Sequence, residues 1–443
     1  MARVFGTAGV RGVFNESQTP SQVYAFAQSI PFVFGRGSYG VAWDGRKTSA
    51  LLARTVASAV NSVGSDVQSF GMAPTPVLAF GTRNRHCEAG FSVTASHNPP
   101  EFSGVKLFNR NGMEIPKSDE ARVERALSVS VMRSGGKFGS VVPDFDVVEE
   151  YIDSIVSRYD HSSAPLRIAI DCANGPGGFV TPRILKGLGH DVIPVNSQIS
   201  WRFTARRPEP TSETLEDFSR VVANLGVDFG FAHDGDADRL VMLDREGRVL
   251  PDSVVACLAL HGLVAASGTV VISENTSMMV AEEAQRMGFT VLRSRVGKTF
   301  ALLQEKGGVF ATEPSKIIDP TWGLWEDGIN AAAMISCLLA RDPGLLDKVL
   351  QTGWNYRQTN IAVPVDMREL QERARDFFRK FGIAEERTLD GYKIVFEDGS
   401  WIMFRASGTE PKTRIYCESK KIETLDTLIQ EGVRCVELSR RLG

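Results

Sequence analysis

The stretch Val41-Ala-Trp-Asp44-Gly-Arg46 is a short apolar run that ends in an acidic residue and a polar turn. A helical segment follows it, and Gly64-Ser-Asp-Val67 then opens a new strand. The pattern recurs twice, as Ile168-Ala-Ile-Asp171 with Gly189-His-Asp-Val192, and as Val270-Val-Ile-Ser-Glu274 with Gly288-Phe-Thr-Val291. A glycine after the helix is a common helix stop, and strand, helix and strand over roughly 25–30 residues form a βαβ unit. Three copies predict three α/β domains of similar build.

The C-terminal part follows a different pattern. Residues 394–404 predict two strands around an Asp398-Gly399 turn, and residues 413–418 predict a third strand. Pro364 cannot donate to a ladder, so Ile361-Ala-Val-Pro-Val365 predicts an edge strand. Helical segments at residues 367–381 and 422–442 flank these strands, which together indicate an α+β module.

The chain length agrees with this division. At roughly 150 residues per domain, 443 residues suggest about three domains, with a latitude of one either way. We predict α/β domains at residues 1–145, 146–245 and 246–350, and a smaller α+β domain at residues 351–443.

Composition excludes several classes of protein. The 50 basic and 53 acidic side chains give a net charge of −3, which argues against a nucleic-acid binder. The most apolar stretch, residues 254–266, is too short to cross a bilayer and contains His261, so we expect no membrane partner. The start of the chain lacks an apolar secretion signal, and no CxxC motif occurs. We therefore expect a cytoplasmic protein with free thiols.

Asp234-Gly-Asp236-Ala-Asp238-Arg239 places three carboxylates two residues apart after an apolar run. Crowded carboxylates repel one another, and a cation relieves that repulsion. An all-oxygen donor set favours Mg²⁺ or Ca²⁺ over zinc. An EF-hand is excluded, because its sixth and twelfth positions would be Arg239 and Arg245 instead of Gly and Glu. The alternative to a metal site is a solvated acidic turn.

A second candidate site follows the strand-like run Ala89-Gly-Phe-Ser-Val, which leads to Ser96 and His97 in a turn with two prolines. Serine is a weak nucleophile unless a base or a charge activates it, and His97 is a candidate base if the turn brings the two side chains together. A plain polar turn is the alternative. Lys106, between apolar neighbours, is either an acid/base group or a surface lysine.

A third candidate is the segment from Arg405 to Pro411, which lies between two predicted strands. Arg405, the hydroxyls of Ser407 and Thr409 and the flexible backbone at Gly408 are suited to surrounding a phosphate dianion. An ordinary hairpin loop is the alternative.

Together these motifs resemble the α-D-phosphohexomutase family, which includes phosphoglucomutase, phosphomannomutase and phosphoglucosamine mutase. The resemblance also includes the Gly-rich loop around Arg11 and extends from Phe5 to about Tyr416. The residues of the motifs most resemble those of archaeal members. It implies three similar α/β domains with mixed sheets and a smaller C-terminal α+β domain around a central cleft.

The resemblance also implies a reaction, the reversible transfer of a phosphoryl group between the 1- and 6-positions of a hexose phosphate. Glucosamine, mannose and glucose phosphates are the candidate substrates, and a hexose 1,6-bisphosphate would be intermediate and activator. The protein would be a monomer or a homodimer. The roles implied for individual residues are phosphoryl carrier and metal ligand for Ser96, Mg²⁺ ligands for Asp234, Asp236 and Asp238, further catalytic residues for His97, Lys106, Arg11 and Arg239, and substrate binding for Arg295, Glu313, Ser315, Arg405, Ser407, Gly408 and Thr409.

The sequence departs from the family pattern in the predicted sugar-binding loop. Thr312, Lys316 and Ile317 replace Gly, Gly and His, and Lys298 replaces an Asp. These changes concern the choice of substrate more than the chemistry. Two alternatives remain open, a non-catalytic sugar-phosphate binding protein and a metal-dependent sugar phosphatase.

Overall fold

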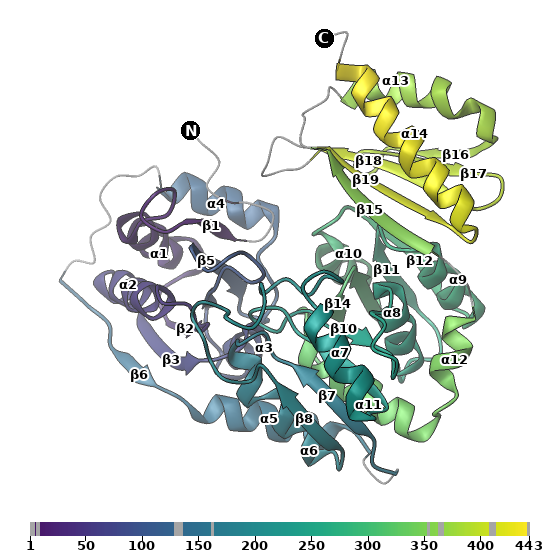
Figure 1. Ribbon diagram of the computed structural model, residues 1–443. Coiled ribbons are helices and arrows are strands. Elements are labelled where there is room, and N and C mark those ends of the chain that lie inside the picture. Colours follow the sequence, from purple (N-terminus) through teal and green to yellow (C-terminus); the bar gives the residue numbers. More distant parts are fainter. Residues whose placement is uncertain are drawn as a thin grey trace. The chain divides into compact units, whose positions relative to one another are not determined.

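The computed structural model describes residue 5 and residues 9–127, 136–160, 164–351, 355–361, 367–406 and 413–440 (Figure 1). The chain divides into two compact units. Unit 1 comprises Met1–Gly262 and Ser315–Gly344, and unit 2 comprises Leu263–Pro314 and Leu345–Gly443.

Unit 1 begins with a six-stranded mixed sheet of order β1-β5-β4-β2-β3-β6. Strands β4, β2, β3 and β6 run parallel, and β5 is antiparallel to both β4 and β1. The strands are β1 (Val10–Val13), β2 (Ser38–Trp43), β3 (Asp66–Met72), β4 (Ala89–Val93), β5 (Phe102–Asn109) and β6 (Val141–Pro143). The helices are α1 (Pro20–Phe34), α2 (Ser49–Ser62), α3 (Thr75–Asn84), α4 (Lys117–Leu127) and α5 (Asp146–Arg158).

The second sheet of unit 1 has the order β10-β9-β7-β8. Strand β7 is parallel to β8 and β9, and β10 is antiparallel to β9. The strands are β7 (Arg167–Asp171), β8 (Asp191–Val195), β9 (Phe229–Ala232) and β10 (Val241–Leu243). The other elements of unit 1 are the 3₁₀ helix η1 (Pro176–Phe179), α6 (Thr181–Gly187), α7 (Glu216–Leu225), α8 (Asp252–His261), β14 (Lys316–Ile318) and α11 (Gly328–Arg341).

Unit 2 contains parallel strands of a third sheet, in which β11 (Thr269–Ser273) pairs with β12 (Thr290–Ser294) and β13 (Phe310–Glu313). Its C-terminal sheet is antiparallel and has the order β15-β19-β18-β17-β16. These strands are β15 (Asn355–Ile361), β16 (Ile383–Arg387), β17 (Tyr392–Phe396), β18 (Trp401–Ala406) and β19 (Thr413–Ser419). The helices are α9 (Met278–Arg286), α10 (Thr299–Lys306), α12 (Leu345–Leu350), α13 (Met367–Phe378), the 3₁₀ turn η2 (Arg379–Phe381) and α14 (Ile422–Arg440).

Alternation of side chains explains how the C-terminal sheet is covered. Ile394, Ile402 and Ile415 belong to the core formed with α13 and α14, which lie side by side in Figure 1. The intervening residues Trp401 and Met403 pack with Met278 in a separate cluster. Since successive strand residues point to opposite faces, this sheet buries both of its faces.

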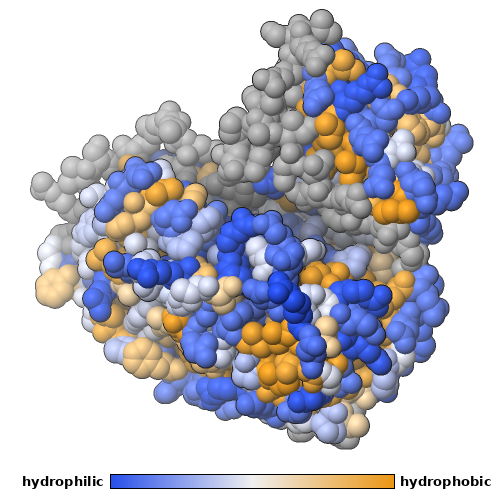
Figure 2. Space-filling view, in the orientation of Figure 1, coloured by the Kyte–Doolittle hydropathy of each residue, from blue (hydrophilic) through white to orange (hydrophobic). Residues whose placement is uncertain are grey.

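The predicted fold class is confirmed. Each predicted glycine stop has a left-handed backbone, with φ of 81° at Gly64, 90° at Gly189 and 90° at Gly288. Strand β15 lies at the edge of its sheet and ends at Ile361, while residues 362–365 of the predicted edge strand, Pro364 among them, lie outside the described residues. Large apolar side chains fill the cores, and the face in Figure 2 mixes broad hydrophilic areas with smaller apolar groups.

All six cysteines are free and buried. They are Cys87, Cys172, Cys257, Cys337, Cys417 and Cys435. Among the helices of the described residues, none is both long and apolar enough to cross a membrane.

Candidate active site

Ser96 lies in the loop that leaves the buried strand β4, and its side chain faces the acidic triplet. The Ser96 hydroxyl donates to Oδ2 of Asp234 at 2.7 Å and lies 3.2 Å from Nδ1 of His97. Neighbouring side chains rarely meet in regular structure, but Ser96 has a φ of 49°, and this left-handed turn brings the pair together. Ser96 is 1% exposed, so water has little access to the hydroxyl.

The three aspartates follow β9 directly and are all buried. One carboxylate oxygen from each lies within 4.8 Å of the others. Oδ2 of Asp236 accepts from Lys106 Nζ at 2.7 Å and from Thr75 Oγ1 at 2.6 Å. The Lys106 ammonium also contacts Oδ2 of Asp238. Strand β5 and the loop after β9, from two sheets, therefore supply opposite charges to one buried cluster.

The pKa values of the charged groups in this cluster shift in different directions. Burial and the two neighbouring carboxylates raise the pKa of Asp234 well above its ordinary value. Burial alone would raise the pKa of Asp236 too, but Lys106 and Thr75 bring it below the ordinary value. The Lys106 ammonium is held charged, because Asp236 and Asp238 raise its pKa more than burial lowers it.

Two arginines border the same cluster. Arg239 donates from Nη2 to Nδ1 of His97 at 3.0 Å, and Arg11 donates from Nη1 to Oδ1 of Asn98 at 3.2 Å. Arg239, burial and Arg11 lower the pKa of His97 far below its ordinary value, so the imidazole is neutral. The Nε groups of both arginines are buried and have no hydrogen-bond partner among the described residues.

The donor set fits a divalent cation. Oδ1 of Asp236 and Oδ1 of Asp238 are buried and accept no hydrogen bond within the described part of the chain. Buried carboxylate oxygens without donors are costly unless a cation binds them. Three carboxylates and a hydroxyl form an all-oxygen set of the kind that Mg²⁺ prefers.

Ser315 and its neighbours lie beside the triplet in unit 1. The Ser315 carbonyl accepts from the Leu240 amide at 2.9 Å, and Ser315 has a φ of 60°. Lys316 is paired with Glu326 at 2.5 Å, and Ile317 is buried. The lysine that departs from the family pattern is therefore neutralised by a neighbouring acid.

Arg295, Glu313 and Arg405 lie in unit 2. The Glu313 carboxylate accepts from the Gly297 amide at 2.8 Å and from the Thr299 hydroxyl at 2.9 Å. Arg405 donates from Nε to Asp390 Oδ2 at 2.8 Å, and Arg295 donates from Nε to the carbonyl of Leu389 at 2.9 Å. Residues 389–390 therefore bring both arginines to one turn. Ser407, Gly408 and Thr409 lie outside the described residues.

Three residues of this site escaped the sequence analysis as site residues. Thr75 holds Asp236, Arg46 binds the loop of Ser96, and Arg206 binds the loop of the triplet. Arg46 ends the first of the repeated stretches, but nothing in that stretch indicates that its side chain binds distant backbone carbonyls.

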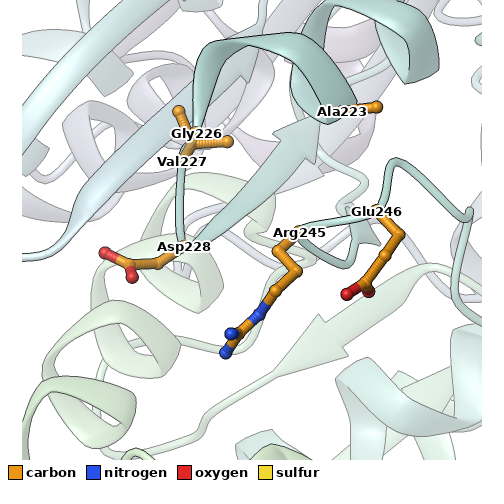
Figure 3. Close-up of a pocket in the computed structure, with 6 residues that line it drawn as sticks. All are labelled: Ala223, Gly226, Val227, Asp228, Arg245 and Glu246. Atoms are coloured by element: carbon orange, nitrogen blue, oxygen red, sulfur yellow. The ribbon is translucent and has the colours of Figure 1, made fainter.

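A surface pocket of unit 1 is separate from this chemistry. It is lined by Ala223, Gly226, Val227, Asp228, Arg245 and Glu246 (Figure 3). Asp228 precedes β9, whereas Asp234 follows it. Ligands of α/β sheets bind at the carboxyl ends of strands, so this pocket is at the unfavoured end.

Domain models of the phosphoglucomutase/phosphomannomutase family match the chain in the expected order. α/β/α domain I matches residues 2–130, domain II residues 149–247, domain III residues 251–356 and the C-terminal domain residues 359–433. Four consecutive matches define the class, a four-domain sugar-phosphate mutase.

Relatives and solved structures agree with that class. The chain is 34% identical to a phosphoglucomutase/phosphomannomutase of Thermococcus kodakarensis, over 99% of each chain. It is 32% identical to a phosphopentomutase of the same organism, over 97% of this chain and 96% of that one. A phosphoglucomutase/phosphomannomutase family protein from Burkholderia thailandensis shares the fold, with a TM-score of 0.87, 24% identity and 99% and 98% coverage. The chain belongs to the phosphoglucomutase/phosphomannomutase family, and its activity is that of a phosphohexomutase.

Proposed function

We propose that the protein is a Mg²⁺-dependent phosphohexomutase in which Ser96 is the phosphoryl carrier. The observation that supports this most is the 2.7 Å hydrogen bond between the Ser96 hydroxyl and Asp234, inside a buried cluster with two further aspartates. A plain polar turn or a solvated acidic turn would not require this burial or this convergence of two loops.

Asp234, Asp236, Asp238 and an oxygen of Ser96 would hold the Mg²⁺. The bound ion would supply a positive charge to the phosphoryl oxygens. Side chains of the protein would supply further positive charge to the same group. Arg239 and Arg11 are placed to stabilise charge on the phosphoryl group, since each has a buried N–H without a partner.

The transfer requires one proton to move for each phosphoryl group. When the group leaves Ser96 Oγ for a sugar hydroxyl, one P–O bond breaks, another forms, and the hydroxyl proton must go to a base. His97 and Lys106 are the candidates for moving this proton, since Nδ1 of His97 lies 3.2 Å from the Ser96 hydroxyl and Nζ of Lys106 donates to Asp236 in the same buried cluster. A hexose 1,6-bisphosphate is formed midway and returns its other phosphoryl group to Ser96.

In unit 2 we assign Arg405, Arg295 and Glu313 to substrate binding. The two arginines converge on residues 389–390, which would place two forked donors at a sugar phosphate. Arg405→Ala is then expected to raise KM for the sugar phosphate with little change in kcat. An unchanged KM would remove Arg405 from the site.

The direct test is to look for phosphate on Ser96 and to follow its transfer. We expect glucose 1,6-bisphosphate to add one phosphate to Ser96, detected by mass spectrometry of the Ser96 peptide. Ser96→Ala should lower kcat at least about 100-fold, a loss of about 3 kcal/mol of transition-state stabilisation. Ser103→Ala, another buried serine of the same sheet, is the matched control and should remain active.

A substrate panel completes the test. Glucose, mannose and glucosamine 1-phosphates should be converted to the 6-phosphates, and ribose 1-phosphate tests the pentose activity named for one relative. Release of inorganic phosphate without isomer formation would establish a phosphatase. Full turnover by Ser96→Ala would refute the phosphoserine mechanism.

A further inference from the structure

Arg46 binds the loop that contains Ser96 with its whole guanidinium group. Nη2 donates to the carbonyls of Ser96 at 2.8 Å and Asn98 at 2.6 Å. Nη1 donates to the carbonyls of Pro99 and Phe102, and Nε donates to Oδ2 of Asp44 at 3.0 Å. All five N–H groups are thereby used, which no other side chain offers in this fork geometry.

Asp44 holds this arginine and the start of the same loop. It follows β2, the parallel neighbour of β4, and its side chain is 1% exposed. Its Oδ2 also accepts from the Thr94 hydroxyl at 2.7 Å, whose oxygen in turn accepts from the Ser96 amide at 2.8 Å. The loop is therefore fixed at both its carbonyls and its amide.

The second α/β domain repeats the arrangement. Asp171 ends β7, the parallel neighbour of β9, and accepts from Nε of Arg206 at 3.0 Å. Nη2 of Arg206 donates to the carbonyl of His233 at 2.6 Å, next to Asp234. The side chains of Arg206 and Asp171 are 5% and 0% exposed.

The two arrangements meet at the reacting groups. Phe203, three residues before Arg206, covers the Arg46 guanidinium, with its ring centroid 4.8 Å away. A Cβ placed on Gly235 would lie 2.5 Å from the Ser96 carbonyl that Arg46 holds. The position of Ser96 relative to Asp234 thus depends on both arginines.

We propose that Asp44–Arg46 and Asp171–Arg206 are a duplicated positioning device, one copy for the phosphoryl-carrying loop and one for the metal-binding loop. The inference rests on the proposed function, since it concerns the same site. A role limited to the buried ion pair would require each arginine to contact only its aspartate. Each arginine also donates to a carbonyl of a neighbouring loop, which indicates that it positions that loop. Displacement of reacting groups by about 1 Å costs about 100-fold in rate, so such loops need rigid support.

The test uses arginine-to-lysine variants, because lysine keeps the charge beside the aspartate and loses the fork. Arg46→Lys should lower kcat and the rate of Ser96 phosphorylation by glucose 1,6-bisphosphate at least about 10-fold, with Mn²⁺ affinity within about twofold of wild type. Arg206→Lys should weaken Mn²⁺ binding at least about 10-fold, measured by calorimetry without substrate. Lys47→Gln and Arg207→Gln, the exposed neighbours, are the matched controls and should match wild type in both readouts.

The crossed pattern separates positioning from a general structural role. If both lysine variants melt earlier but keep wild-type phosphorylation rates and metal affinity in their folded fraction, the inference is wrong. Equal losses of both readouts in both variants also contradict it, since each copy should affect its own loop first. An active Ser96→Ala would refute the proposed function, whereas the Mn²⁺ affinity of Arg206→Lys would still report on the second copy.

Discussion

Asp171 and Glu274 occupy corresponding places, each at the carboxyl end of the central strand of an α/β domain, but their surroundings differ. Both oxygens of Asp171 accept hydrogen bonds, from Arg206, Ala173 and Asn196. The Glu274 carboxylate oxygens accept none among the described residues. Arg387 and Lys393 lie 3.5 Å and 3.7 Å from its Oε1.

The origin of the cations explains the difference. Arg206 belongs to the same α/β domain as Asp171 and reaches the loop of the acidic triplet. Arg387 and Lys393 belong to β16 and β17 of the C-terminal sheet, and Lys393 Nζ donates to the Glu274 carbonyl at 2.8 Å. One repeated acidic position therefore supports the loop of Ser96 or of the acidic triplet in unit 1, and a contact between strands of two sheets in unit 2.

Removing Asp44 or Asp171 should have the largest effect on the free energy of unfolding. Asp44→Ala and Asp171→Ala each leave a buried arginine without its countercharge, which typically costs about 3–5 kcal/mol of unfolding free energy. Denaturant unfolding measures this loss. A loss below about 1 kcal/mol in either variant would show that the aspartate is no more important for stability than Glu274 is expected to be.

The second largest effect is expected from Mg²⁺ binding, which should stabilise unit 1 and leave unit 2 unchanged. Mg²⁺ at about 100 times its Kd should add about 2.7 kcal/mol to the unfolding free energy of the part that binds it. Hydrogen exchange should show slower exchange at residues 234–239 and no change at residues 274–279. Asp236→Asn should remove the effect, and equal protection of both segments would contradict a site confined to the triplet.

Glu274→Gln should have a smaller effect than either aspartate substitution. The glutamine keeps the shape, and the carboxylate it replaces accepts no hydrogen bond among the described residues. Burial and Arg293 lower the pKa of Lys393 well below its ordinary value despite Glu274, so the lysine is able to lose its charge. We expect a change of about 1 kcal/mol or less in denaturant unfolding. A loss of about 3 kcal/mol would make Glu274 equivalent to Asp171.

The smallest effect is expected at the surface next to Arg206. Arg207 pairs with Glu213, but both side chains are mostly exposed. Arg207→Gln should change stability by no more than about 0.5 kcal/mol in the same unfolding experiment. A larger loss would indicate that part of the Arg206 contribution belongs to its neighbour.

Local sequence rules were sufficient to predict the repeated fold. Gly64, Gly189 and Gly288 end helices because the left-handed conformation they adopt is nearly free for glycine, and this requirement is visible in the sequence. The acidic triplet was visible for a similar reason, since its spacing after an apolar run already limits the chemistry. Both features depend on residues close together in the chain.

The loop-binding arginines were not predictable in the same way. Arg46 acts on carbonyls about 50 residues away, and every residue has a carbonyl, so the acceptors leave no trace in the sequence. Thr75 reaches Asp236 across 161 residues, which only the pairing of two domains brings about. Sequence patterns identified the groups that we propose to react, while the groups that we propose to position them required the structure.

The buried free cysteines give the chain a built-in set of reporters of local opening. Cys87 and Cys172 lie in the first two α/β domains, and Cys417 and Cys435 lie in β19 and α14 of the C-terminal α+β domain. Burial raises the pKa of Cys87 to about 12 and that of Cys435 to about 11, so the reactive thiolate is scarce at neutral pH. Alkylation rates followed peptide by peptide would therefore record how often each domain opens, without adding a label or changing a residue.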